Sequence, residues 1–91
     1  VHAVWVDGMG QRIVDAIAVG APAYTRGDVA GCLRLYRQTA EAIVSDLGAD
    51  ASASGAVRRL RDALETSGRE GVEEGAWTMR RAFDELLAGR A

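Results

Sequence analysis

The sequence predicts an all-α domain built as a bundle of four antiparallel helices. Three observations predict this class. Apolar residues recur at the three- and four-residue spacing of a buried helix face in four separate segments. After Val6 there is no alternating β-branched run, and no Asn-Gly or Asp-Gly turn lies between two such runs. The connections between the segments are short, which favours antiparallel neighbours.

Length and composition indicate a single domain over residues 1–91, with a hydrophobic share of 48% that is too high for a disordered chain. The eleven basic residues are all arginine and are interspersed with thirteen acidic ones, so no basic face for nucleic acid is expected. The longest apolar stretch, residues 16–24, is too short to span a bilayer. These features predict a globular domain with neither a nucleic-acid partner nor a transmembrane segment.

The first helix is predicted over about residues 7–21. Four residues at helical spacing form its expected buried face: Met9, Ile13, Ile17 and Gly20. Pro22 favours a kink or an end of this helix, because proline lacks a backbone N–H and its ring crowds the preceding turn.

The second helix, over residues 28–47, has the clearest pattern. Asp28 follows Gly27 and is a good N-cap residue. The apolar face continues for five turns without interruption: Val29, Cys32, Leu33, Tyr36, Ala40, Ile43, Val44 and Leu47. Gly48 marks the end, and residues 48–54 are predicted to be a flexible loop because they are rich in Ala, Ser, Asp and Gly.

The third and fourth helices are predicted over residues 54–66 and 70–88. The apolar face of the third is formed by Val57, Leu60 and Leu64. The expected buried stripe of the fourth is Val72, Ala76, Met79, Phe83, Leu86 and Leu87. Three acidic residues open the fourth helix, where the helix dipole favours negative charge: Glu70, Glu73 and Glu74.

One segment carries a recognisable motif. From Gly20 to Thr39 the chain reads GAPAYTRGDVAGCLRLYRQT, with small residues, two tyrosines and a Gly-Asp turn at regular spacing. This pattern resembles a single tetratricopeptide (TPR) helical hairpin. The resemblance implies that Gly20 and Cys32 let two helices approach closely, while Tyr24 and Tyr36 fill the space beyond the crossing.

Few residues suit catalysis or metal binding. Cys32 is the only cysteine and His2 the only histidine, which excludes an intrachain disulfide and a Cys/His metal cluster. We expect an inert thiol, because Cys32 lies on the apolar face and Asp28 opposes its ionisation. The three carboxylates that open the fourth helix lack a cation-binding loop and are predicted to be solvated. No cofactor or metal is predicted.

Trp77 is the most ambiguous residue, because it lies about 100° away from the apolar stripe of its helix. Arg80 and Arg81 follow at the spacing that lets an arginine stack on the indole ring. Trp77 is either a boundary residue or an anchor for a partner, since Trp and Arg dominate interface hot spots. Trp5 raises the same question. The candidate interaction residues are therefore Trp77, Arg80, Arg81 and Trp5.

The leading functional prediction is a non-catalytic protein-interaction or accessory domain whose partner is another protein. The alternative is a domain that binds a small molecule or cofactor in a pocket between the first, second and fourth helices, lined by Tyr24, Cys32 and Tyr36. A third possibility is a fragment of an enzyme whose other catalytic residues lie outside this chain. An exposed tryptophan patch would favour the first, and an apolar cavity with convergent polar groups the second.

Overall fold

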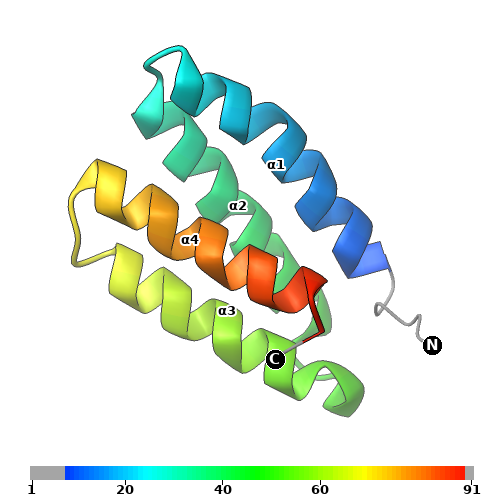
Figure 1. The fold of residues 1–91 in the computed structure, drawn as a ribbon. Helices are drawn as coiled ribbons and strands as arrows, with labels where there is room; N and C mark the ends of the chain where they lie inside the picture. Colours follow the sequence, from blue (N-terminus) through cyan, green and yellow to red (C-terminus); the bar gives the residue numbers. More distant parts are fainter. Residues whose placement is uncertain (1–7, 90–91) are drawn as a thin grey trace.

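A computed structural model describes residues 8–89 and shows four α-helices and one short 3-10 helix (Figure 1). The elements are α1 (Met9–Thr25), α2 (Val29–Leu47), η3 (Ala51–Ala53), α3 (Ser54–Ser67) and α4 (Val72–Leu87). The described part of the chain contains no strand, so the prediction of an all-α helical bundle is confirmed. Successive helices run antiparallel and form two hairpins, α1–α2 and α3–α4 (Figure 1).

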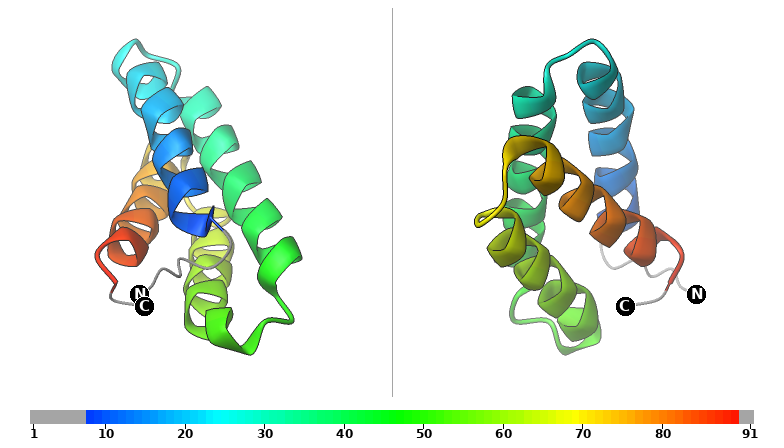
Figure 2. Two further views of the ribbon diagram at one scale, coloured as in Figure 1. Left: turned by 90° about the vertical axis from the view of Figure 1, so that its right-hand side faces the viewer. Right: turned by 60° about the vertical axis from the view of Figure 1, so that its left-hand side comes forward.

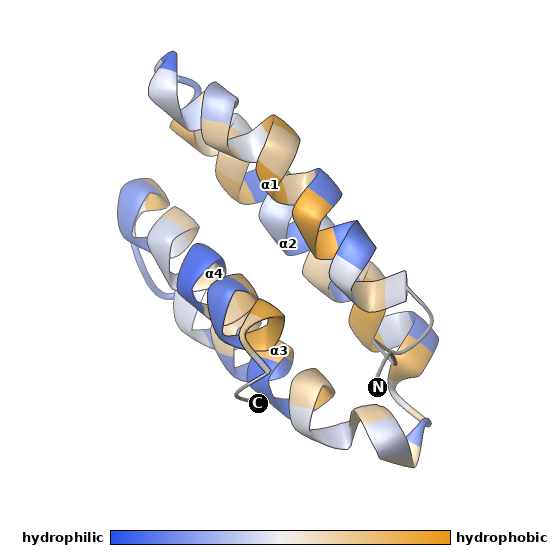
Figure 3. Ribbon diagram, turned by 45° about the vertical axis from the view of Figure 1, so that its right-hand side comes forward, coloured by the Kyte–Doolittle hydropathy of each residue, from blue (hydrophilic) through white to orange (hydrophobic). Residues whose placement is uncertain are grey.

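The α2 helix holds the bundle together, because it packs against each of the other three helices. The α3–α4 hairpin lies against the α1–α2 hairpin, with α4 next to α2 (Figure 2, right). The α1 helix packs closely on α2 along its length but makes few contacts with α4. Apolar and polar segments alternate along the helices, as expected of amphipathic helices around one core (Figure 3).

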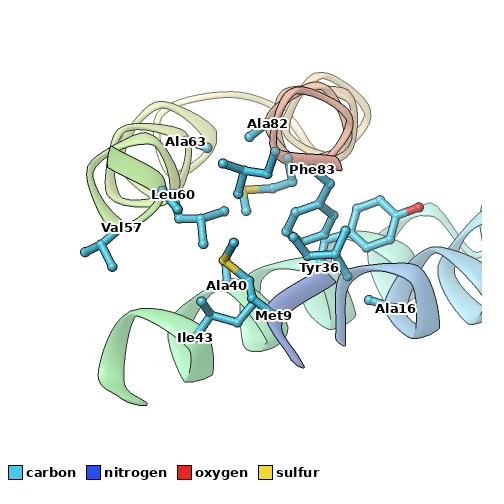
Figure 4. Close-up of a cluster of buried hydrophobic side chains, with 14 of the residues drawn as sticks. Met9, Ala16, Tyr36, Ala40, Ile43, Val57, Leu60, Ala63, Ala82 and Phe83 are labelled. Atoms are coloured by element: carbon cyan, nitrogen blue, oxygen red, sulfur yellow. The ribbon is translucent and has the colours of Figure 1, made fainter. Parts of the chain in front are cut away.

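The core is formed by large side chains from all four helices, with alanines where the helices come closest. The rings of Tyr36 and Phe83 meet edge to face, with centroids 5.3 Å apart (Figure 4). Around them lie five other large, fully buried side chains: Ile13, Ile43, Leu60, Met79 and Leu86. Ala40, Ala63 and Ala82 are also buried, and their small volume lets the backbones approach.

The predicted end of the first helix at residue 21 is wrong, because α1 continues through Pro22 to Thr25. The N–H of Arg26 donates to the carbonyl of Pro22 at 3.0 Å, which completes the last turn. Proline deprives only the carbonyl of Ala18 of its helical donor, and Ala18 is exposed to water. Because only one turn follows the proline, the helix tolerates it.

Two residues of the stripe predicted for the fourth helix are not buried. Val72 is 46% exposed and Leu87 is 37% exposed. The helix begins at Val72 rather than residue 70, with Gly71 as its N-cap, so no helical turn precedes Val72 to cover its side chain. Leu86 takes the core position at the other end, and its neighbour Leu87 is turned away by about 100°.

The helix ends are fixed by local polar contacts. Asp28 caps α2, since its Oδ1 accepts the N–H of Gly31 at 2.9 Å. The segment predicted as a flexible loop, residues 48–54, contains η3 and the first residue of α3. The carboxylate of Asp50 organises this segment by accepting hydrogen bonds from the N–H and the hydroxyl of Ser52.

Three arginines join neighbouring helices at the surface of the bundle. Arg12 of α1 lies 2.9 Å from Asp46 of α2, and Arg59 of α3 binds Glu85 of α4 through two hydrogen bonds. Arg37 of α2 donates to the carbonyl of Leu64 at 2.9 Å and to the hydroxyl of Ser67, at the last turn of α3. A cation at the C-terminal end of a helix complements its dipole, so Arg37 ties α2 to α3.

Candidate functional site

A pocket of about 270 Å³ lies between α1, α2 and α4. Its floor is made of buried residues, and its rim includes the exposed Thr25 and Trp77. Eight residues line it: Ala21, Tyr24, Thr25, Cys32, Tyr36, Ala76, Trp77 and Arg80. The structure thus brings together the three residues predicted for a pocket and two of those predicted for an interaction surface.

Next to the pocket, at Gly20, the backbone of α1 lies close to the ring of Tyr36 of α2. A Cβ atom at Gly20 would lie 2.4 Å from Cε1 of Tyr36, so only glycine lets the tyrosine ring pack against the α1 backbone at this position. The hairpin closes at Gly27, whose φ of +97° is in the left-handed region that favours glycine. Between these two glycines, Ala21 presents a small side chain to the pocket and leaves its volume open.

The rim is closed by Tyr24 and Trp77, which join α1 to α4. The indole Nε1–H of Trp77 donates to the hydroxyl of Tyr24 at 3.0 Å, and this hydroxyl donates to Oε2 of Glu73 at 2.8 Å. The two rings also meet edge to face, with centroids 5.7 Å apart. Trp77 remains 46% exposed, so it is a boundary tryptophan whose indole N–H is bound within the protein.

Arg80 forms an ion pair within its own helix. The Nε of Arg80 lies 3.1 Å from Oδ1 of Asp84, one turn further along α4. The guanidinium also interacts with the Tyr36 hydroxyl at the pocket floor. Asp84 pairs with Arg80 but does not itself line the pocket, so the guanidinium is the part of this ion pair that faces the pocket.

The floor of the pocket holds a thiol and a phenol, Cys32 and Tyr36, which lie one turn apart on α2. Burial raises the pKa of the Cys32 thiol, and the opposing effects of Tyr36 and Arg80 are smaller. Burial, followed by the contact with Cys32, raises the pKa of Tyr36 to about 12. At the rim, the hydrogen bond to Glu73 raises the pKa of Tyr24. The thiol therefore stays protonated near neutral pH, where it is a weak nucleophile.

The raised pKa of Tyr36 predicts a loss of stability in alkali. Its pKa is about 12 in the folded chain and near its ordinary value of 10 in the unfolded chain. The contribution of Tyr36 is therefore complete below pH 10 and is lost as the pH rises from 10 to about 12. It amounts to roughly 2–3 kcal/mol.

Denaturant unfolding at a series of pH values measures this loss. The Tyr36→Phe variant is the control, because it removes the contribution of Tyr36 to the pH dependence of stability and keeps that of Tyr24. In the Tyr24→Phe variant the one remaining tyrosine should ionise near pH 12 by tyrosinate absorbance. Ionisation near its ordinary value of 10 would contradict the buried phenol.

The remaining candidates lie outside the pocket or outside the described residues. Arg81 is exposed and borders a shallow surface depression with Trp77 and three glutamates: Glu70, Glu73 and Glu74. Glu70 accepts a hydrogen bond from the hydroxyl of Thr78 at 2.5 Å. Within residues 8–89, no three His, Cys, Asp or Glu side chains are grouped to hold a metal ion. Trp5 lies outside the described residues.

Sequence reasoning missed the small residues that make the pocket. Ala21 and Ala76 line it from opposite sides, yet alanines at helical spacing are too common to indicate a cavity. The contact of Trp77 with Tyr24 was also missed, because 53 residues separate the two along the chain. The only available signal was the position of Trp77 beside, rather than on, the apolar stripe.

Comparisons with known proteins add no further evidence about this site. No model of a known protein family matches the chain, and neither a curated protein nor a solved structure matches it significantly. No helix in the described part of the chain is both long and apolar enough to cross a membrane.

Proposed function

We propose that this domain is a non-catalytic binding module that holds a small, largely apolar molecule in the pocket between α1, α2 and α4. The observation that carries the proposal is the pocket itself, which has a buried floor and polar groups on its wall. Ligand sites are typically concave and mostly apolar, with a few polar groups that fix orientation. Here these groups belong to Tyr24, Tyr36, Trp77 and Arg80.

The volume supports a ligand of one or two rings. A dry protein cavity of about 150 Å³ holds a benzene molecule. The pocket offers about 270 Å³ and is open at its rim, so a substituted ring fits with part of it in solvent. The edges and faces of Tyr24, Tyr36 and Trp77 give an aromatic ligand suitable contacts.

The chemistry of the pocket supports binding rather than catalysis. None of the described residues that line it is a histidine or a carboxylate, the usual general bases. The thiol of Cys32 is buried, and its raised pKa keeps it in the protonated form, which is a weak nucleophile.

A second candidate function is recognition of another protein through the outer surface of α4. Trp77 leaves 46% of its surface exposed, and the exposed Arg81 follows it by one turn. Tryptophan and arginine are enriched among the residues that dominate interface energetics. This surface and the pocket share Trp77, whereas Arg81 belongs to the surface alone.

Binding is tested with three probes of one shape: benzyl alcohol, benzoate and benzylammonium. At least one of them should shift the amide NMR signals of Ala21, Cys32 and Ala76 and the indole signal of Trp77. For so small a molecule we expect a dissociation constant on the order of 1 mM.

Two leucine variants localise the binding. The Ala21→Leu variant fills the pocket and should lower the affinity for the probe about tenfold or more. Ala18→Leu, on the same helix but exposed and outside the pocket, should leave binding unchanged. Absence of binding by all three probes, or equal binding in both variants, would overturn the proposal. The Arg81→Glu variant distinguishes protein recognition by the α4 surface from ligand binding in the pocket, since it reverses a charge on that surface and does not alter the pocket lining.

A further inference from the structure

We propose that the ligand of this pocket is uncharged and carries a hydrogen-bond acceptor, such as a carbonyl or hydroxyl oxygen, that binds Arg80. This inference rests on the proposed function and specifies its ligand. It follows from two properties of the pocket wall: the balance of its charges and the use of its hydrogen-bond donors.

An anionic ligand fits the charges poorly. Arg80 is the only charged residue among those that line the pocket, and its Nε lies 3.1 Å from the carboxylate of Asp84. A second carboxylate, Glu73, stands at the rim, where it accepts the hydrogen bond of Tyr24. An entering anion would compete with Asp84 for the guanidinium and approach Glu73, and like charges in a partly desolvated site repel strongly.

A cationic ligand fits poorly for a different reason. The rings of Tyr24, Tyr36 and Trp77 would attract an organic cation through their faces. However, the guanidinium of Arg80 lines the same small volume and would repel it at short range, whereas the carboxylate of Glu73, which would attract it, does not line the pocket. An uncharged molecule avoids both penalties and still gains the apolar contacts of the pocket.

The hydrogen bonds of the wall decide which polar group the ligand carries. The indole N–H of Trp77 is donated to Tyr24, and the hydroxyl of Tyr24 is donated to Glu73. The hydroxyl of Thr25 is donated to the carbonyl of Ala21. Arg80 has five N–H donors, and one of them serves Asp84. Arg80 is thus a wall residue with several donors left for a ligand, even after its interaction with Tyr36.

The relative affinities of the three probes test this inference on the intact chain. Benzyl alcohol should bind at least about fivefold more tightly than benzoate or benzylammonium at neutral pH. The Arg80→Met variant keeps the apolar stem but removes the hydrogen-bond donors, so it should lower the affinity for benzyl alcohol about tenfold. Asp84→Asn removes the competing carboxylate, so it should increase the affinity for benzoate while benzyl alcohol changes little.

The outcomes separate this inference from the proposed function. If benzoate or benzylammonium binds the wild-type pocket as tightly as benzyl alcohol or more so, the binding module stands and the uncharged ligand is overturned. If benzyl alcohol binds best but equally well to Arg80→Met, the role of Arg80 is overturned. If none of the probes binds, both proposals fall. Thermal unfolding of Arg80→Met and Asp84→Asn verifies that each variant is folded.

Discussion

Replacement of Phe83 by alanine is expected to reduce the free energy of unfolding by about 3–5 kcal/mol. The Phe83 side chain is completely buried, and its ring meets that of Tyr36 edge to face at the centre of the core. The substitution loses the transfer free energy of the ring, leaves a cavity and removes the aromatic pair. Because small domains are stable by only about 5–15 kcal/mol, this is a large fraction of the total.

Thermal unfolding followed by far-ultraviolet circular dichroism measures this effect. The Tm of Phe83→Ala should fall by roughly 12 °C or more. Phe83→Leu retains most of the volume and should cost less than about 1.5 kcal/mol. Leu87→Ala, four residues further along α4 at a partly exposed site, should cost much less than Phe83→Ala. A Phe83→Ala variant within about 1 kcal/mol of the wild type would contradict the central position of this ring.

The second large effect is expected for Gly20→Ala. In most helix positions this change stabilises a protein by roughly 0.5–1 kcal/mol, because alanine has less backbone freedom to lose than glycine. Here the new Cβ would lie 2.4 Å from Cε1 of Tyr36, whose ring is held by the core. We therefore expect the opposite sign, a destabilisation of about 1–3 kcal/mol.

The control for Gly20→Ala is the same substitution at Gly55, an exposed residue in the first turn of α3. Gly55→Ala should be neutral or stabilising in the same denaturant titration. A double variant that combines Gly20→Ala with Tyr36→Leu should show less than the sum of the two single losses, since leucine removes the ring that clashes. Stabilisation by Gly20→Ala alone would show that α1 and Tyr36 do not meet closely.

The second helix could be predicted from the sequence because its signals are local. Asp28 supplies a cap within one turn, and the apolar face is set by spacing alone. The end of the first helix could not be predicted in this way. The free-energy cost of Pro22 depends on how many turns follow it and on whether water reaches the carbonyl of Ala18, which has lost its helical donor. Similarly, Val72 and Leu87 have the right spacing, but their burial depends on where the neighbouring helices end.

In the candidate site, too, the features set by local sequence could be predicted and those set by the packing of distant segments could not. The Gly-Asp turn places Tyr24, Cys32 and Tyr36 on two adjacent antiparallel helices, so a pocket that includes all three was accessible from spacing. The contribution of α4 was only partly accessible. Trp77 and Arg80 were selected as surface residues, whereas in the structure both also line the pocket. That orientation depends on the angle between two hairpins, which no local pattern encodes.

The small contact between α1 and α4 affects how the pocket opens. Regions with few buried contacts detach in local fluctuations well before the whole chain unfolds. The α1 helix packs closely on α2 but makes few contacts with α4, one of which is the Tyr24–Trp77 hydrogen bond, so a separation of α1 from α4 would uncover the pocket floor. A molecule seated there touches both helices at once. A bound molecule would therefore hold α1 and α4 together and slow their separation. Occupancy of the pocket would in this way be coupled to the rigidity of the α1–α2 hairpin.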